Sequence, residues 1–253
     1  MKKIICSILS VGLLSTAFAQ KPVDRSKQPK PGPAPVISIK DAVTYNLPNG
    51  MTVLVVENHK LPKISVRLNI DQGPILEGKK AGVTDIMGDM LMEGTSGKPK
   101  DQFDEEVDRI GADLNLSASG GNVSALSRYF EQALALMADA IQHPALPQES
   151  FDKIKKQKIT GIKSQEKSAG AISRRVLNAL AFGKTSALGE FETEETYNNL
   201  TLDDIKTAYK EYVTPSRSYL TFVGDIKPEA AKALATKYFG KWTGKKLTLM
   251  DIR

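Results

Sequence analysis

The sequence predicts an α+β fold. Residues 43–47 and 51–56 are β-rich runs, and residues 64–70 alternate apolar and polar side chains. Most of the later segments have the apolar spacing of helices, and strand signals return between them at residues 112–127 and 219–224. Strands that come first and recur between helix pairs are typical of an α+β domain.

The strands are predicted from turn chemistry and alternation. Asn49-Gly50 between the first two runs is a strong signal for a hairpin. Residues 112–127 read as two short strands broken at Gly120-Gly121, and residues 219–224 as a buried strand. The sequence contains no internal repeat.

The helices are predicted from apolar periodicity together with start and stop residues. They are residues 82–92, closed by Gly94; 101–110; 129–141, stopped by Pro144; 147–167, rich in lysine; 172–182; 203–213, capped near Thr201 and ended by Pro215; and 228–239, with Pro228 in the first turn.

The composition is that of a globular protein. The 253 residues are 41% hydrophobic and 25% charged, which excludes disordered, collagen-like and disulfide-scaffold classes. A single cysteine, Cys6, excludes an intramolecular disulfide framework and a cysteine-built zinc site.

Four segments are expected along the chain. Residues 1–19 have the basic start, short apolar run and Ala-Phe-Ala ending of a secretory signal peptide, too short to span a membrane. Residues 20–37 are a tether rich in proline and lysine, and residues 38–246 are the folded domain. Residues 247–253 are a tail or the start of a missing second domain. We therefore expect an exported protein, periplasmic or extracellular, without an integral membrane span.

The net charge does not indicate a nucleic-acid-binding protein. The chain carries a formal charge of +6, and cleavage of the signal peptide removes Lys2 and Lys3. No run of Lys and Arg is interleaved with aromatic residues, so nucleic acid is not an expected partner.

The order of several short motifs resembles the N-terminal domain of the insulinase (pitrilysin) metallopeptidases over about residues 41–245. The motifs are Leu47-Pro48-Asn49-Gly50-Met51, residues 73–79, Gly94-Thr95, Ile110-Gly111-Ala112, His143-Pro144 with Phe151, Tyr212-Val213-Thr214-Pro215, Val223-Gly224-Asp225 and Phe239-Gly240-Lys241-Trp242. The resemblance implies a mixed sheet with helices packed on one face, as in the mitochondrial processing peptidases, and a second domain of the same kind in full-length members.

The resemblance also implies a zinc helix with His-x-x-Glu-His, and this sequence departs from it. Aligned through Gly82 and Gly94-Thr95, the two histidine positions are Asp85 and Asp89, and the glutamate position is Gly88. The third zinc ligand falls at Gly161. Because zinc needs these ligands and a base to activate its water, we expect no catalytic residues, no metal ligands and no zinc cofactor.

Other metal arrangements remain open at this point. Asp85 and Asp89 share a helix face and suit Mg²⁺ or Ca²⁺ better than Zn²⁺, although a solvated or cleft-facing acidic pair is the simpler interpretation. Glu166 becomes a third ligand only if the alignment slips by five residues. His59 and His143 lack a partner at metal spacing, so we expect surface or capping roles for them.

A peptide-binding edge is the second expected site. In the family this strand pairs with an extended peptide, and the matching residues here are Ala118, Ser119, Gly120, Gly121, Asn122 and Val123. Pairing through the backbone needs no particular side chain, so it can persist without catalysis.

The expected function is that of an exported, non-catalytic insulinase-family homologue. It pairs with a catalytic subunit of the family as a hetero-oligomer, or binds extended peptides itself. Two alternatives stay open: an active metallopeptidase with a displaced metal site, and a periplasmic binding or scaffold domain.

Overall fold

The computed structural model describes residue 32 and residues 41–246. The chain divides into two compact units, Met1–Lys40 and Asp41–Arg253, and every element described below belongs to the second unit. The predicted signal peptide, most of the predicted tether and residues 247–253 lie outside the described residues.

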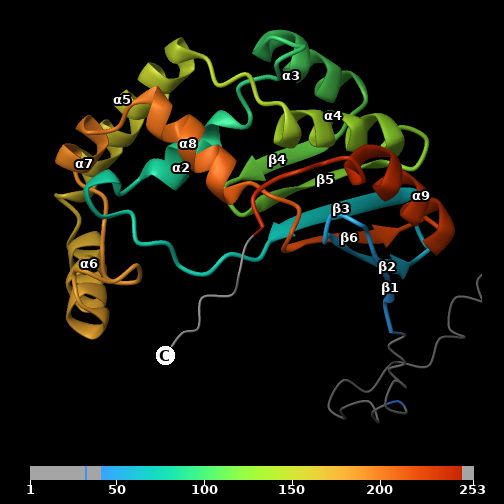
Figure 1. The fold of residues 1–253 in the computed structure, drawn as a ribbon, viewed down its shortest axis with the longest axis horizontal. Coiled ribbons are helices and arrows are strands. Elements are labelled where there is room, and N and C mark those ends of the chain that lie inside the picture. The colour runs from blue at the N-terminus through green and yellow to red at the C-terminus, as the bar shows by residue number, and fades with distance from the viewer. Residues whose placement is uncertain (1–31, 33–40, 247–253) are drawn as a thin grey trace, which may run out of the picture. The chain divides into compact units, whose positions relative to one another are not determined.

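Within the described residues, six strands form one mixed sheet in the order β1-β2-β6-β3-β5-β4 (Figure 1). The strands are β1 (Val43–Asn46), β2 (Thr52–Glu57), β3 (Lys63–Ile70), β4 (Asp113–Ser117), β5 (Gly120–Leu126) and β6 (Ser218–Gly224). β2 and β6 run parallel, and all other neighbours are antiparallel. The predicted α+β class and mixed sheet are confirmed.

The helices lie over one face of the sheet and beyond its β4 end (Figure 1). They are α2 (Val83–Met90), α3 (Lys100–Arg109), α4 (Phe130–Gln142), α5 (Gln148–Gln165), α6 (Ala169–Phe182), α7 (Glu194–Asn198), α8 (Leu202–Tyr212) and α9 (Pro228–Phe239). α4 packs on β5 and α9 on β2, whereas α2 packs against α8, α5 and β4. In the described part of the chain, no helix is both long and apolar enough to cross a membrane.

Side-chain alternation decides which face of the sheet carries the core. In β3, Ile64, Val66 and Leu68 are buried beneath the helices, while Arg67 and Asn69 are exposed on the opposite face. An antiparallel sheet with one solvated face has this pattern, whereas a sheet covered on both faces has continuous apolar strands.

β6 lies in the middle of the sheet and connects its two halves. It pairs with β2 on one side and β3 on the other, although it comes from residues 218–224 near the end of the described chain. Phe222 of β6 is fully buried, and its ring meets the Phe130 ring of α4 edge-on, with 6.1 Å between centroids. The segment after α8 is therefore part of the same core.

The predicted Asn-Gly hairpin joins β1 to β2 and also ties to α9. Gly50 has a φ of 91°, a left-handed conformation that glycine adopts without strain. The Asn49 side-chain amide donates to the Phe239 carbonyl at 2.8 Å and to the Trp242 carbonyl at 3.0 Å. These bonds hold the turn against the end of the domain.

The predicted position of the sheet edge is wrong by one strand. Ala118 and Ser119 form the turn between β4 and β5, and Gly120, Gly121, Asn122 and Val123 belong to β5. β5 pairs with β3 and with β4, so among the described strands β4 is the edge strand at this end of the sheet. The glycines suggested a turn, but Gly120 instead starts the strand where the Leu68 carbonyl approaches within 2.2 Å of the position a Cβ would take.

His59 lies on the surface between two carboxylates. Its Nδ1 is 2.6 Å from Asp225 Oδ1 and its Nε2 is 2.5 Å from Glu57 Oε1. The Ser127 hydroxyl donates to Asp225 Oδ2 at 2.9 Å rather than to the imidazole, so the cluster lacks the nucleophile–base contact of a hydrolase. The hydrogen bond to Asp225, followed by that to Glu57, raises the pKa of His59 above its ordinary value.

The His59 cluster makes stability depend on pH. Because the folded pKa is raised, this stabilisation is fully present below the unfolded pKa and is lost as pH rises through the folded value. In thermal unfolding from about pH 5.5 to 8.5, the wild type is expected to lose its advantage over His59→Asn as pH rises. An imidazole that titrates at or below its ordinary pKa by NMR would contradict this prediction.

Candidate functional site

The start of α2 is fixed by a carboxylate cap. Glu77 accepts hydrogen bonds from the Gly82 N–H at 2.5 Å and the Thr84 N–H at 3.1 Å. A negative charge here is favourable because the first helical N–H groups have no partner within the helix. The Glu190 carboxylate in turn accepts from the N–H groups of Glu77 and Gly78, at 2.7 and 2.8 Å. The helix that carries the candidate site is thus anchored to the loop after α6.

Asp85 and Asp89 line a cavity of about 540 Å³. The two side chains lie one turn apart on the same face of α2, and each is about half exposed. The other walls of the cavity are the loop from Gln72 to Glu77 and the turn from Ser117 to Ser119. The cavity therefore lies between α2 and the end of the edge strand β4.

A lysine from α5 binds both aspartates. Lys158 Nζ is 2.8 Å from Asp85 Oδ2 and 2.8 Å from Asp89 Oδ2. Its side chain is 25% exposed. Burial alone lowers the pKa of a lysine, but the hydrogen bonds and charges of the two carboxylates outweigh burial and raise the pKa of Lys158. The space between the aspartates therefore holds a permanent positive charge at neutral pH.

Tyr197 of α7 completes the contacts of Asp85. Its ring is buried, and its hydroxyl donates to Asp85 Oδ2 at 3.1 Å. Burial, and next the charge of Asp85, raises the pKa of Tyr197, so the hydroxyl stays a protonated donor. Asp85 Oδ2 thus accepts from both a phenol and an ammonium group.

Gly88 lies between the two aspartates and has a close backbone neighbour. A Cβ built there would lie 2.6 Å from the Ala118 backbone nitrogen, in the turn between β4 and β5. The turn therefore occupies the room that any side chain at position 88 needs. Gly161 on α5 differs, since a Cβ there would meet nothing within 4 Å.

The remaining candidates lie apart from the aspartate pair. Glu166 is exposed at the end of α5, about two turns beyond Lys158. His143 ends α4, with Nδ1 3.3 Å from Asp139 Oδ1, and His59 belongs to the surface cluster described above. Across the described residues, no three His, Cys, Asp or Glu side chains gather into a group that could hold a metal ion.

Sequence reasoning missed Lys158 and Tyr197. Lys158 precedes Gly161 by three residues, so both lie on one face of the predicted helix, and this spacing was the available signal. Tyr197 belongs to α7, which was not predicted although Thr193 and Thr196 form a reciprocal cap at its start. A short helix with a Thr-x-x-Thr cap lacks the usual Glu or Gln of the capping box.

A comparison with known protein families shows to which family the chain belongs. Residues 52–193, more than half of its length, match the family described as Insulinase (Peptidase family M16). The chain belongs to the insulinase family. Residues 199–252 match a second description, Peptidase M16 inactive domain.

The curated relatives differ in the activity that their names state. An "Uncharacterized zinc protease YmxG" of Bacillus subtilis is 26% identical over 208 residues, covering 79% of this chain and 50% of the relative. A "Non-peptidase homolog YmxG" of Helicobacter pylori is 22% identical over 239 residues, covering 90% and 49%. Bovine "Cytochrome b-c1 complex subunit 1, mitochondrial" is 24% identical over 213 residues, covering 82% and 44%. This chain spans about half the length of these relatives.

Solved structures share the fold. A peptidase M16 inactive domain from Pseudomonas fluorescens superposes with a TM-score of 0.75 at 24% identity, covering 84% of this chain and 53% of that one. The first half of the periplasmic protease PqqL from Escherichia coli gives a TM-score of 0.70 at 17% identity, covering 84% and 48%.

The two family matches meet inside one sheet. The first match contains β2 to β5, and the second contains β6, which pairs with β2 and β3 in the middle of the sheet. The boundary between the matches, at α7, is therefore not a boundary between two folded units.

The residues at the positions that resemble the zinc motif do not fit a zinc ion. Asp85 and Asp89, the residues expected at the histidine positions, both bind the Lys158 ammonium group. Gly88 offers no base, and Gly161 offers no ligand. Catalytic zinc sites in proteins use three side-chain ligands together with an open position for water.

Alanine at the two glycines should have opposite effects. Gly88→Ala is expected to lower the free energy of unfolding by about 1–2 kcal/mol, because overpacking against the turn exceeds the helix preference of alanine. Gly161→Ala is the matched control and should raise it by up to about 1 kcal/mol, because its Cβ enters open space. Chemical denaturation of both variants checks the pair, and equal effects would contradict the close approach at Gly88.

Removal of the lysine charge should loosen α2 from α5. Lys158→Met is expected to lower the free energy of unfolding by about 1 kcal/mol, because two partly exposed carboxylates lose one shared partner. Lys163→Met, which breaks a more exposed pair with Glu194, is the control and should cost less than about 0.5 kcal/mol. Adding Asp85→Asn and Asp89→Asn to Lys158→Met should restore part of the loss, and no recovery would count against the ion network.

Proposed function

We propose that this protein is a non-catalytic member of the insulinase family that works as a subunit beside an active zinc peptidase of the same family. The observation that carries the proposal is the ammonium group of Lys158 between Asp85 and Asp89. The ammonium group occupies an oxygen of each carboxylate, so a divalent cation would have to compete with it for these ligands, and the expected base position, Gly88, has no side chain. Zinc-dependent hydrolysis therefore lacks its ligands and its base here.

The relatives support a role within an assembly. The Helicobacter pylori relative is named a non-peptidase homologue, and the bovine relative is named a subunit of a larger complex. A chain that has lost the reaction can still form half of a substrate chamber, because this depends on surfaces rather than on the zinc ligands.

A free sheet edge supports binding of an extended peptide in this role. Within the part of the chain that the structure describes, β4 pairs with a strand on one side only, and its last residue, Ser117, lines the cavity beside Asp89. An extended peptide can add to such an edge through backbone hydrogen bonds. The proposed peptide edge is therefore β4, Asp113–Ser117, rather than the predicted residues 118–123.

The proposed function includes export of the protein from the cytoplasm. It rests on the signal-peptide pattern of residues 1–19, and a structural neighbour from Escherichia coli is a periplasmic protease. Mass spectrometry of the mature N-terminus tests it, and cleavage after Ala19 is the expected result.

The metal content of the purified protein tests the loss of catalysis. After dialysis against zinc, the wild type is expected to hold no stoichiometric metal and to show no chelator-sensitive peptide cleavage. The variant Asp85→His/Asp89→His/Lys158→Glu replaces the ion network by two imidazoles and a carboxylate, and should bind about one zinc per chain with a raised melting temperature.

The control keeps the lysine. Asp85→His/Asp89→His retains the Lys158 ammonium group beside the new imidazoles and should bind zinc more weakly than the triple variant. A wild-type protein with one tightly held zinc and peptidase activity would overturn the proposal in favour of a displaced metal site. A folded triple variant without zinc affinity would show that Asp85, Asp89 and Lys158 do not surround the metal position.

A further inference from the structure

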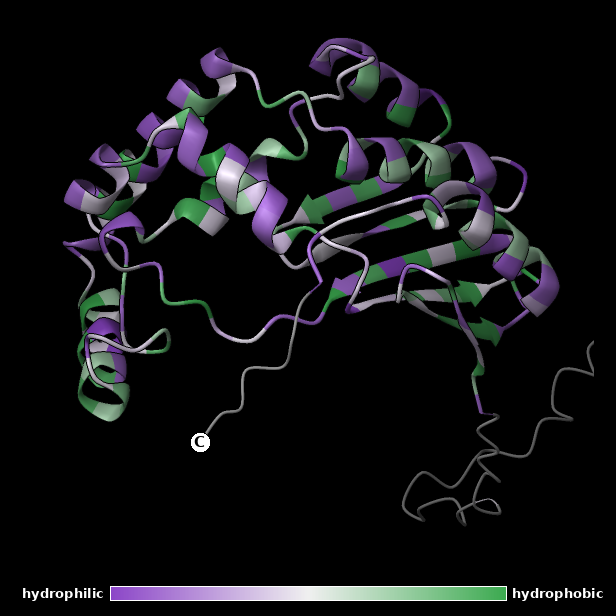
Figure 2. Cartoon of the chain, viewed as in Figure 1, coloured by the Kyte–Doolittle hydropathy of each residue, from purple (hydrophilic) through white to green (hydrophobic). Residues whose placement is uncertain are grey.

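α6 differs from every other described α-helix because none of its residues is buried. Apolar turns are nevertheless visible along it in Figure 2. Its exposed large apolar side chains, with their exposed fractions, are Ile172 (45%), Val176 (52%), Leu177 (65%), Leu180 (81%) and Phe182 (51%). A cluster of this kind marks an interaction surface more often than isolated exposed residues do.

The apolar residues share one side of α6. Ile172, Val176 and Leu180 follow one another at four-residue steps, and Leu177 flanks the same stripe. We call these four residues the α6 stripe. The apolar stripe of an amphipathic helix normally packs against the hydrophobic core, but this stripe faces solvent in the described chain.

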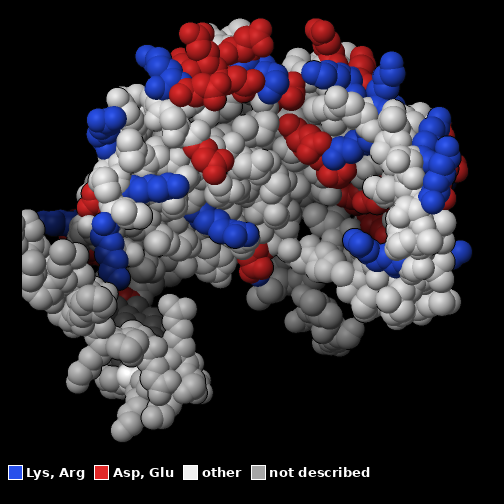
Figure 3. Space-filling view, turned by 180° about the vertical axis from the view of Figure 1, so that it is seen from behind, with Lys and Arg blue, Asp and Glu red and all other residues white. Residues whose placement is uncertain are grey.

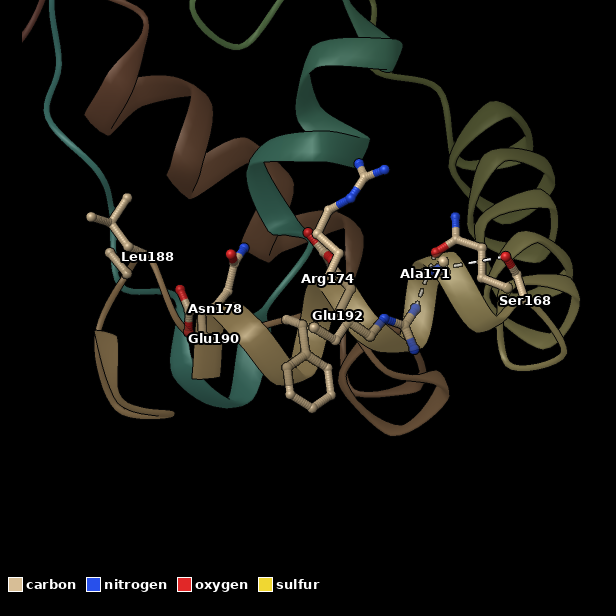
Figure 4. Close-up of a pocket in the computed structure, with 12 residues that line it drawn as sticks. Ser168, Ala171, Arg174, Asn178, Leu188, Glu190 and Glu192 are labelled. Carbon is tan, nitrogen blue, oxygen red and sulfur yellow. Dashed lines mark hydrogen bonds between the residues drawn. The ribbon is translucent and has the colours of Figure 1, made fainter. Parts of the chain in front are cut away.

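The polar side of α6 faces the rest of the domain. Arg174, Arg175 and Asn178 line a cavity of about 670 Å³ that the loop at residues 187–192 closes on the other side (Figure 4). Arg175 also donates to Gln165 at 3.1 Å and lies 5.6 Å from the centre of the Phe191 ring. Polar and cation–π contacts therefore hold the helix in place with its apolar side outward.

The segment around the stripe is basic. Residues 167–184 contain Lys167, Arg174, Arg175 and Lys184 and no acidic residue. Lys167 and Lys184, at the two ends of α6, are exposed and have no carboxylate partner within the described residues. Figure 3 shows the surface at the α6 end of the domain as mostly uncharged, with both basic and acidic side chains near its margins. A complementary surface is apolar with an acidic rim.

We propose that the α6 stripe is the docking surface for a second insulinase-family domain, which presents an apolar groove with acidic side chains at its rim. This inference rests on the proposed function as a subunit. We expect the partner to be a protein of the same family for two reasons. This chain spans about half the length of its relatives, and the bovine relative is named as a subunit.

Two other occupants fit the surface less well. A second copy that docked through the same stripe would bring the exposed Lys167 and Lys184 of each chain to the contact, with no acid in residues 167–184 to balance them. Arg174 and Arg175 lie on the opposite side of the helix and do not enter this contact. An anionic membrane would match the charge, but residues 167–184 contain no Trp or Tyr, the residues that favour the membrane interface.

A photo-cross-linking residue at position 180 tests the surface in the full chain, expressed in the cells that encode it. The expected result is a cross-link to an insulinase-family domain, identified by mass spectrometry. Leu61 provides the matched control, because it is a similarly exposed leucine, 69% exposed, in the loop between β2 and β3. The same probe at position 61 should give no such product.

A variant separates docking from folding. Leu177→Ser/Leu180→Ser should keep the wild-type melting temperature, because both side chains are exposed, while losing at least tenfold in affinity for the cross-linked domain. If the domain still co-purifies with the variant, or if position 180 links only to a second copy or to lipid, the α6 proposal fails while the subunit role stands. If no insulinase-family domain co-purifies with the wild type, both proposals fail.

Discussion

The fold depends on the insertion of β6 between β2 and β3. Among the described strands, the hairpin of β1 and β2 is linked by hydrogen-bonded pairing to the β3-β5-β4 half of the sheet through β6, and the parallel ladder between β2 and β6 is that link. The strand comes from residues 218–224, so the sheet closes only when distant parts of the chain have met. Contacts of high sequence separation form late, because the closure entropy of the intervening chain precedes the gain from pairing.

The candidate site is held together by hydrogen bonds and ion pairs among its own side chains. Glu77 and Glu190 fix the start of α2, and Tyr197 donates a hydrogen bond to the side chain at position 85. Lys158 offsets part of the negative charge of Asp85 and Asp89, because its ammonium group contacts both carboxylates. The Lys158 ammonium group thus joins α5 to α2 through contacts within the chain.

Local sequence patterns predicted the helices and strands well, but they did not predict the order of the strands in the sheet. α9 begins and ends as predicted, because Pro228 suits the first turn and Gly240 follows the last residue of the helix. β3 was visible from strict alternation. No local pattern could show that β6 lies between β2 and β3, because pairing depends on the whole core. The edge was placed at residues 118–123 because the family resemblance implied it, and no local pattern in these residues shows that β4 lies outside β5.

The turn packed on Gly88 makes the proposed loss of catalysis difficult to reverse by single substitutions. A glutamate at this position would have to displace the backbone at Ala118, and so would almost any other side chain. Zinc ligands regained at positions 85 and 89 would still meet the Lys158 ammonium group and would lack a base. Every single step back therefore brings either strain or an incomplete site, and selection for peptidase activity has no smooth route by which to restore it.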